Sequence, residues 1–430
     1  MTGLVKWFVI GQPYDTKIYA YDENGSIYSI TSGGVCTFLR KVANSSGQGF
    51  DLLNDYIYYS QDSQIGRYGP LSTTPTFTDN WQTGLTTTST TKFAPAKAFK
   101  EGMAFGFGNN LAWWDGSVFN ATKIVLPPGI QIRCLDVVDE FLVMGTWTGT
   151  TITDSEKGYC FFWDGTATSF NFFVEMPEGG VNALVNSRNR LFSIIGSSGY
   201  LYLNYAPFQK VHKIPNVAVG NYVEVYPGAV TNWKGITHFG ASANTDSTTI
   251  VNGVYQWGAK SDRFPDVMNF AYGISTGNTL GSNVKIGALK GDGNQLFIGW
   301  EDTTTSPTTY GIDRVLQTNS PATSGYIQSL IFDDNRIYQE KMTEIVKATH
   351  KPLRTGESVQ LGYDLDRSGT FTLGTANTTV GSKETRLTVS KNARFTEAQV
   401  KLLLGATGTT SPVVTSWAMQ YDDLQQEERI

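Results

Sequence analysis

The chain has 430 residues, of which 40% are hydrophobic, 13% aromatic and 17% charged, and its formal net charge is -5. That length is sufficient for two or three domains with a large buried core. The negative charge, with no run of Lys and Arg to offset it, argues against nucleic-acid binding, and no apolar stretch approaches the roughly 20 residues that span a bilayer.

One pattern recurs seven times between residue 1 and about residue 320. A short apolar strand ends in a small residue, a polar loop follows, and a strand rich in Tyr or Trp comes next. Anchors spaced roughly 37 to 59 residues apart are typical of the four-stranded blades of a β-propeller. One blade cannot bury both faces of its own sheet, so several must pack around an axis. The copies begin at Leu4–Gly11, Asp55–Ser60, Met103–Gly108, Phe141–Gly145, Leu191–Gly196, Ile236–Gly240 and Leu296–Gly299.

Asp-Gly pairs follow the aromatic strands of two copies, at Asp115-Gly116 and Asp164-Gly165. Such pairs favour tight hairpins, because Gly accepts positive φ and Asp hydrogen-bonds its own turn. The sequence therefore predicts an all-β fold with a seven-bladed propeller over residues 1–322. Six or eight blades stay open as alternatives, because the second copy lacks the terminal Gly and its second strand is short.

The repeat stops around Thr318–Gly325, where the composition is that of a linker. Alternating residues beyond it predict about seven short strands, typical of a β-sandwich or jelly roll over residues 323–424. Phe395–Leu404 could instead form a short helix, and residues 425–430 are expected to be a polar tail. The strands are predicted at Tyr326–Phe332, Glu344–Thr349, Ser358–Asp364, Phe371–Leu373, Arg386–Val389, Gln399–Leu404 and Val413–Tyr421.

Catalytic and cofactor-binding motifs are scarce. Cys36, Cys134 and Cys160 lie far apart beside apolar residues, so we expect buried free thiols and assembly in a reducing cytoplasm. The three histidines lie in separate segments without neighbouring ligands, which argues against a zinc site, and His238 is expected to pack inside a strand. No nucleophile elbow or phosphate loop occurs, so we predict neither an enzyme nor a cofactor.

Two groups of carboxylates need consideration. Asp364–Gly369 has the alternating oxygens of a calcium loop, but Thr375 stands where the closing Glu would be, and we interpret the segment as a β-turn. Asp136, Asp139 and Glu140 surround one repeat strand, and paired carboxylates can hydrolyse glycosidic bonds. We interpret these acids as solvated turn residues.

Tryptophans recur near equivalent positions of the repeat, at Trp114, Trp163, Trp257 and Trp300. Aromatic faces stack well on sugars, which makes these four rings a possible ligand-stacking site. Packing between neighbouring blades also requires large rings at equivalent positions, and packing is the interpretation we prefer.

The C-terminal quarter contains a glycine-turn and strand pattern at Leu353–Asp364 and Gly369–Gly374, then Thr410–Val414, and it closes with a strand ending Gln420–Asp422. An aromatic, Thr-rich propeller followed by such a sandwich resembles structural proteins of tailed-bacteriophage tails. The resemblance implies a non-enzymatic virion component of the tail tip, nozzle or fibres, assembled in the host cytoplasm. Its expected partners are its own copies, other virion proteins and the host surface. No functional residue is transferred by it.

Two alternatives to a structural role follow from the same features. A propeller that binds carbohydrate or a host receptor would stack sugars on exposed rings. A glycosidase would need carboxylates that converge in the propeller channel.

Overall fold

The computed structural model describes the chain except residues 43–47, 62, 86–92, 150–156, 177–178, 188–189, 196–199, 204–208, 214–222, 244–251, 259–265, 277–282, 305, 317–322, 330, 334–338, 408–409 and 425–430. The regular elements of the described residues are β-strands and include no α-helix, which confirms the all-β prediction. No helix long and apolar enough to cross a membrane is found among them. The chain divides into two compact units, Met1–Leu316 and Gln317–Ile430.

The first unit contains, in its described residues, seven small antiparallel sheets that follow one another along the chain, and none of them closes on itself. The first three sheets consist of β1 (Val5–Ile10), β2 (Ile18–Asp22), β3 (Ser26–Ile30) and β4 (Cys36–Lys41); β5 (Gly49–Leu53), β6 (Tyr56–Gln61), β7 (Gln64–Gly69) and β8 (Thr76–Gln82); and β9 (Ala96–Phe99), β10 (Gly102–Phe107), β11 (Asn110–Trp114) and β12 (Phe119–Val125).

The next four sheets repeat the same meander order, with two changes. In the sixth sheet both β21 and β22 pair with β23, and the seventh sheet has three described strands. These sheets consist of β13 (Ile130–Val138), β14 (Phe141–Thr148), β15 (Tyr159–Trp163) and β16 (Phe172–Glu175); β17 (Val181–Ser187), β18 (Arg190–Ile195), β19 (Tyr200–Leu203) and β20 (Gln209–Lys213); β21 (Val223–Glu224), β22 (Val230–Trp233), β23 (Ile236–Ala243), β24 (Gly253–Gly258) and β25 (Val267–Tyr272); and β26 (Val284–Asp292), β27 (Gln295–Asp302) and β28 (Thr309–Leu316).

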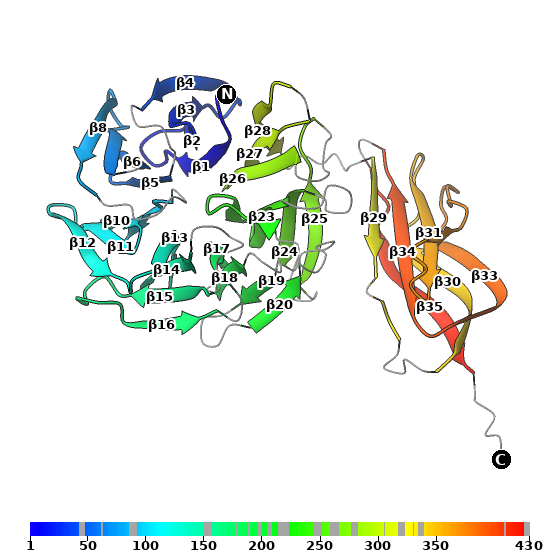
Figure 1. Ribbon diagram of the computed structural model, residues 1–430. Coiled ribbons are helices and arrows are strands. Elements are labelled where there is room, and N and C mark those ends of the chain that lie inside the picture. Colours follow the sequence, from blue (N-terminus) through cyan, green and yellow to red (C-terminus); the bar gives the residue numbers. More distant parts are fainter. Residues whose placement is uncertain are drawn as a thin grey trace, which may run out of the picture. The chain divides into compact units, whose positions relative to one another are not determined.

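The sheets of the first unit lie around a common centre, with the first strand of each sheet innermost (Figure 1). Contacts run in sequence through these first strands, from β1 to β5, β9, β13 and β17, then to β22 and β26. The series closes because β26 also packs beside β1. Hydrophobic clusters fill the spaces between neighbouring sheets, so each sheet is covered by the sheets before and after it.

Glycines allow the innermost strands to approach one another closely. A side chain at Gly49 would overlap the carbonyl oxygen of Ala94, and one at Gly287 would overlap that of Val5. Each of these carbonyls belongs to the first strand of the neighbouring sheet or to the residues leading into it. The sheets therefore meet backbone to backbone at the centre.

The recurring sequence pattern starts at different strands in different sheets. Leu4–Gly11 contains β1, the first strand of its sheet, whereas the other six copies coincide with second strands. Strands of both kinds are short, apolar and buried, so the sequence pattern alone could not distinguish them.

The second unit contains two antiparallel sheets, in the orders β29-β34-β31-β32 and β33-β30-β35. Apolar residues of both sheets form one cluster, which includes Val346, Leu361 and Leu402. The helix considered for Phe395–Leu404 is wrong, because this segment ends β33 and forms most of β34. The expected tail, 425–430, lies outside the described residues. The strands are β29 (Ser324–Gln328), β30 (Lys341–His350), β31 (Ser358–Leu365), β32 (Thr372–Leu373), β33 (Glu384–Phe395), β34 (Ala398–Gly405) and β35 (Val414–Asp423).

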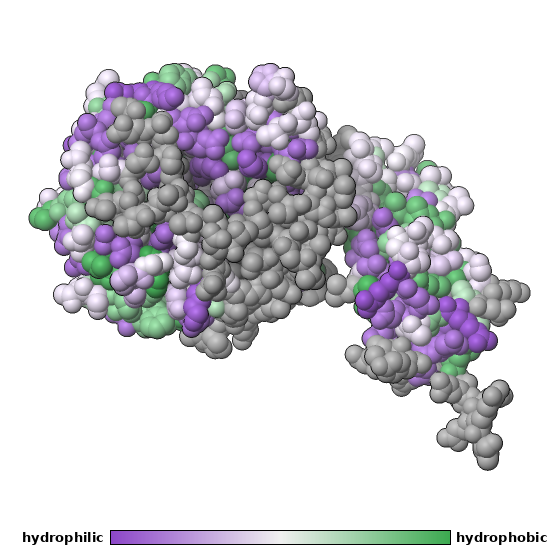
Figure 2. Space-filling model, in the orientation of Figure 1, coloured by the Kyte–Doolittle hydropathy of each residue, from purple (hydrophilic) through white to green (hydrophobic). Residues whose placement is uncertain are grey.

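The surface is mixed in polarity, and one of the three cysteines is exposed. On the face shown in Figure 2, hydrophobic residues are scattered among hydrophilic ones. Cys134 and Cys160 are buried free thiols, as expected. Cys36 is exposed, contrary to the prediction, because it begins β4, an outermost strand that is exposed along most of its length.

Gly287→Ala tests the close approach at the centre. The added methyl group would overlap Val5 and the side chain of Leu4, so we expect it to lower the free energy of unfolding by about 1–3 kcal/mol. Urea denaturation followed by circular dichroism measures the change. Gly33→Ala is the matched control, because its added carbon would meet only the Thr31 hydroxyl at 3.7 Å. Equal stabilities for the two variants would contradict the backbone-to-backbone packing.

Candidate functional site

The centre of the first unit is the candidate functional site, because two groups of polar and charged side chains come together there. The first group lies on the first strands of the second to sixth sheets. We call its members, Asp51, Lys97, Asp136, Asn186 and Thr231, the axial links. The second group lies on first strands and on the residues that face them. We call its members, Lys6, Glu23, Arg133, Glu224, Lys285 and Glu301, the charged cluster.

The axial links join the second to the fifth sheets in sequence, and the sixth sheet to the seventh. Asp51 of the second sheet accepts a hydrogen bond from the backbone nitrogen of Ala98 in the third sheet, at 2.8 Å. Lys97 of that sheet forms an ion pair with Asp136 of the fourth, with Nζ and Oδ1 2.7 Å apart. The second oxygen of Asp136 accepts from the backbone nitrogen of Asn186 in the fifth sheet, at 2.7 Å.

The same kind of contact continues through the later sheets. Asn186 donates its side-chain amide to the carbonyl oxygen of Val137 at 3.0 Å. Thr231 of the sixth sheet accepts from the backbone nitrogen of Gly291 in the seventh, at 3.4 Å. Apart from the Lys97–Asp136 ion pair, each of these links binds a backbone group of the neighbouring sheet, which fixes the position of one sheet against the next.

Neighbouring charges act on the pKa of two lysines beside these links, Lys97 and Lys290. Burial alone would lower the pKa of Lys97, but the attraction of Asp136 and Asp51 outweighs it and raises that pKa. Lys290 occupies the position on β26 that corresponds to Asp136 on β13. Burial lowers the pKa of Lys290, and the charge of Lys97 acts in the same direction.

The charged cluster forms where the innermost strands are irregular. The pairing of β1 shifts register around Lys6, and that of β13 shifts around Arg133. A bulge of this kind redirects the extra residue's side chain, and here both side chains are cationic and largely buried. Irregular pairing therefore supplies two of the three positive charges of the cluster, and the third, Lys285, lies in a regularly paired part of β26.

Arg133 is the most deeply buried member of the charged cluster, with 1% of its side chain exposed. Its guanidinium lies between the rings of Phe93 and Trp147, 4.1 and 3.8 Å from their centroids. It donates to the carbonyl oxygen of Asn182 at 3.0 Å and pairs with Glu224 at 3.2 Å. One side chain of the fourth sheet thus contacts the fifth and the sixth.

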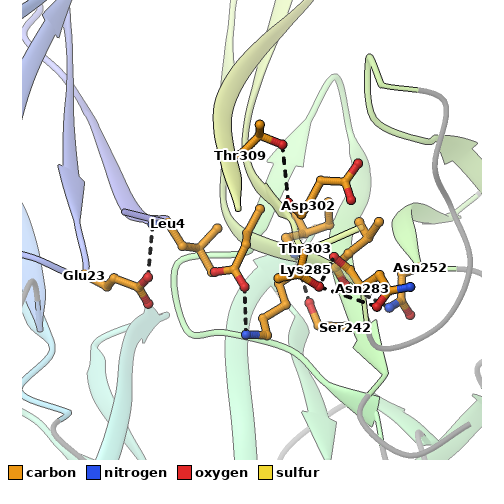
Figure 3. A network of polar contacts seen from close by, with 12 residues as sticks. Leu4, Glu23, Ser242, Asn252, Asn283, Lys285, Asp302, Thr303 and Thr309 are labelled. Carbon is orange, nitrogen blue, oxygen red and sulfur yellow. Dashed lines mark hydrogen bonds and ion pairs between the residues drawn. The ribbon is translucent and has the colours of Figure 1, made fainter. Parts of the chain in front are cut away.

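Lys6 and Lys285 complete the cluster. The Lys6 Nζ lies 3.2 Å from the centroid of the Tyr226 ring and 3.9 Å from Glu23. Lys285 pairs with Glu301 at 2.9 Å, and Glu23 accepts from the backbone nitrogen of Leu4 (Figure 3). Burial lowers the pKa of Lys6 to about 8, although Glu23, Glu224 and Glu301 act in the opposite direction.

Asp136, Asp139 and Glu140 do not share one environment. Asp139 and Glu140 lie in the exposed turn between β13 and β14, as expected. The solvated-turn interpretation is wrong for Asp136, which is a buried strand residue. Both of its carboxylate oxygens bind neighbouring sheets, so the side chain is engaged in holding the fold.

The four tryptophans lie in packed surroundings. Trp163, Trp257 and Trp300 are buried, with 0%, 8% and 7% of their surface exposed. Trp114 is half-buried and packs 5.3 Å from the rings of both Tyr58 and Trp81. Trp114 is therefore the one of the four that is not buried.

The segment Asp364–Gly369 forms a turn whose acids bind backbone groups. Asp364 accepts from the backbone nitrogens of Ser368 and Gly369, at 3.0 and 3.1 Å, and Asp366 accepts from that of Thr396 at 2.7 Å. A recess of about 220 Å³ lies beside it, lined in part by Arg367 and Glu397, which pair with each other. Among the described residues, no group of three or more His, Cys, Asp or Glu could hold a metal ion.

His238 is a packed strand residue. It is buried in β23, and its Nδ1 lies 3.1 Å from the carbonyl oxygen of Ile236. Burial lowers its pKa. The side chain of His212 lies outside the described residues.

No protein-family model matches the chain, and no curated protein is detectably similar to it in sequence.

The sequence reasoning missed the axial links and the charged cluster. A signal was present, because Asp51 and Lys97 are single charges inside otherwise apolar strands, and Asp136 shares its mostly apolar strand with Arg133. A charge in a strand that is buried on both faces must be paired or hydrogen-bonded. Recognising it required knowing that these strands are innermost.

Asp136→Asn and Lys97→Met test the link between the third and fourth sheets. Each substitution leaves one member of the pair without its partner, so we expect a loss of about 2 kcal/mol in the free energy of unfolding. The double variant should lose less than the sum of the two, as a double-mutant cycle in urea would measure. Glu140→Gln, in the adjacent exposed turn, should leave stability unchanged. Strict additivity would show that the pair does not couple the sheets.

Lys6 predicts a dependence of stability on pH. Its pKa is about 8 in the folded chain, against the ordinary lysine value of 10.5 that applies to the unfolded chain. The unfolded state therefore holds more protons on Lys6 between these values, and the contribution of Lys6 to the free energy of unfolding should rise with pH, by about 2 kcal/mol from pH 7.5 to 9.5. Burial raises the pKa of the Cys134 and Cys160 thiols, whose effect on stability in this range has the opposite sign, so the prediction concerns the difference between variants. In urea titrations at several pH values, the free energy of unfolding of the wild type, and of Lys41→Met, should gain this amount relative to Lys6→Met. A difference that stays constant with pH would assign no such role to Lys6.

Proposed function

We propose that the chain is a non-enzymatic structural protein of a tailed-bacteriophage tail. In this proposal the first unit is a seven-bladed β-propeller and the second is a β-sandwich. Each of the seven sheets is one blade, and the contact of β26 with β1 closes the wheel. The single cluster shared by the two sheets of the second unit supports the sandwich.

The observation that carries the proposal is the use of the central polar side chains. A propeller enzyme would direct such groups toward a substrate in its channel. Here Asp51, Lys97 and Asp136 instead bind the neighbouring sheets. Arg133 likewise spans from one sheet to two others. Groups arranged in this way stiffen the wheel, which is what a scaffold requires.

Assignment to a phage tail follows from the resemblance of the C-terminal quarter. Leu353–Asp364 ends in β31, and Gly369–Gly374 contains the short strand β32. These are the positions at which the resemblance implies turns and strands. The partners in this proposal are copies of the chain and other virion proteins, which it meets through polar, hydrogen-bonded surfaces.

Carbohydrate binding is the less favoured function. It would need accessible ring faces, whereas Trp163, Trp257 and Trp300 are buried. In this proposal a host glycan is a candidate ligand of the assembled virion, and glycan binding is not the main role of the chain.

Imaging of assembled particles tests the location. The chain would be tagged at its C-terminus in the virus that encodes it, and particles labelled with a tag-binding antibody fragment would be examined by cryo-electron microscopy. We expect the label on the tail at a fixed stoichiometry, with untagged particles as the control. Recovery of the tagged chain solely as a free secreted monomer would overturn the proposal. Polysaccharide turnover that Asp136→Asn abolishes would replace it with an enzymatic function.

A further inference from the structure

The seventh sheet differs from the other six at its outer side. Among the described residues it ends at its third strand, β28, whereas each of the other sheets continues to a fourth strand in the meander. β28 pairs with β27 over its full length, from Thr309 opposite Asp302 to Leu316 opposite Gln295, without a register shift. It therefore presents a straight edge of eight residues.

Burial shows that β28 is an uncovered third strand. All five residues of β3 are buried, as are four of the five in β15 and four of the six in β24. None of the eight residues of β28 is buried: six are half-buried and the two end residues are exposed. The other third strands owe part of their burial to a fourth strand, and no described strand covers β28 in this way.

The devices that usually protect a sheet edge are weak at β28. Proteins protect exposed edges with bulges, prolines or free charges. β28 has no bulge and no proline. Its charged side chains are engaged on the two faces of the sheet: Asp313 accepts from Ser275 at 2.8 Å, and Arg314 donates to the carbonyl oxygen of Ser32 at 2.6 Å. These contacts hold the two charged side chains in place. Among the described residues, no strand pairs with the outer edge of β28.

We propose that β28 pairs antiparallel with β28 of a second copy of this chain. Two identical antiparallel strands are related by a two-fold axis perpendicular to the sheet, so residues of equal parity lie opposite each other. With Ile312 on the axis, Arg314 lies opposite Tyr310 of the second copy, and Asp313 lies opposite Gly311 of the second copy. No like charges meet in this register.

Two other registers are unfavourable, which favours the one centred on Ile312. An axis through Asp313 would place two carboxylates opposite each other, and an axis through Arg314 would do the same with two guanidinium groups. The register centred on Ile312 instead allows Arg314 to lie over an aromatic ring, a favourable contact. The two seventh sheets would then form one continuous sheet of six strands.

Charge variants of one residue test this register. Tyr310→Glu would place a carboxylate opposite Arg314 of the second copy and strengthen the dimer, whereas Tyr310→Lys would weaken it. Two symmetric contacts change, so we expect dissociation constants that differ by on the order of ten-fold or more. Within one chain the preference is reversed, because Tyr310 lies opposite Glu301 on β27. A general effect on folding would therefore rank the two variants in the opposite order.

Analytical ultracentrifugation of the purified full-length chain would measure the dissociation constants, and hydrogen exchange would follow the amides of β28. We expect a wild-type dimer whose β28 amides exchange more slowly as concentration rises. A wild type that stays monomeric, or variants that rank in the reverse order, would overturn the inference. The inference rests on the proposed function only in that a scaffold binds its own copies. A dimer absent from the tail would overturn that function alone, and a monomeric chain located in the tail would overturn this inference alone.

Discussion

The close approach of backbones at the centre of the first unit is the constraint on which the rest of its structure depends. Where Gly287 meets the carbonyl oxygen of Val5, no side chain fits between neighbouring sheets. Polar groups near such a contact lose water, and a buried polar group is costly unless it is paired. The axial links meet this demand by binding backbone groups of the next sheet, so the same contacts that satisfy the polar groups also join the sheets.

The radial arrangement explains the distribution of small and large residues. Sheets that diverge from a common centre are close together inside and farther apart outside. Gly145 and Gly240 therefore occupy second strands near the centre, where Gly145 lies against the side chains of Cys134 and Val181. Aromatic pairs occupy the third and fourth strands, such as Phe161 with Phe173 and Tyr255 with Phe270, whose ring centroids are 5.5 and 5.2 Å apart. In these places the size of the residues follows the width of the space to be filled.

The sequence predicted the strands better than it predicted their roles. Alternating residues located Ser358–Asp364 within one residue of β31, because local pattern determines whether a segment is extended. The same reasoning could not show that Leu4–Gly11 is a first strand or that Asp136 faces a neighbouring sheet. Nor could it show that Cys36 lies on an outermost strand. These properties depend on where a strand lies in its sheet and on which sheet packs beside it, and both are set by contacts distant in sequence.

The charged cluster in particular depends on three-dimensional neighbours. Arg133 and Glu224 are separated by 91 residues and form a hydrogen bond because the fourth and sixth sheets meet near the centre. A bulge directs Arg133 to this place, and bulges leave no mark in the pattern of apolar residues. Composition did indicate the architecture, since few charges and many aromatics suit short, stacked sheets.

The meander order of the first unit has a consequence for how such a chain can change. Among the described strands, none is exchanged between the first and the last sheet, and β1 packs beside β26 with its own partners in sequence. New termini placed in a connection between sheets would leave the described sheets whole, so this arrangement is compatible with circular permutation. Duplication or deletion of one entire sheet would likewise interrupt no ladder of hydrogen bonds, which makes the number of sheets a property that can evolve in whole steps.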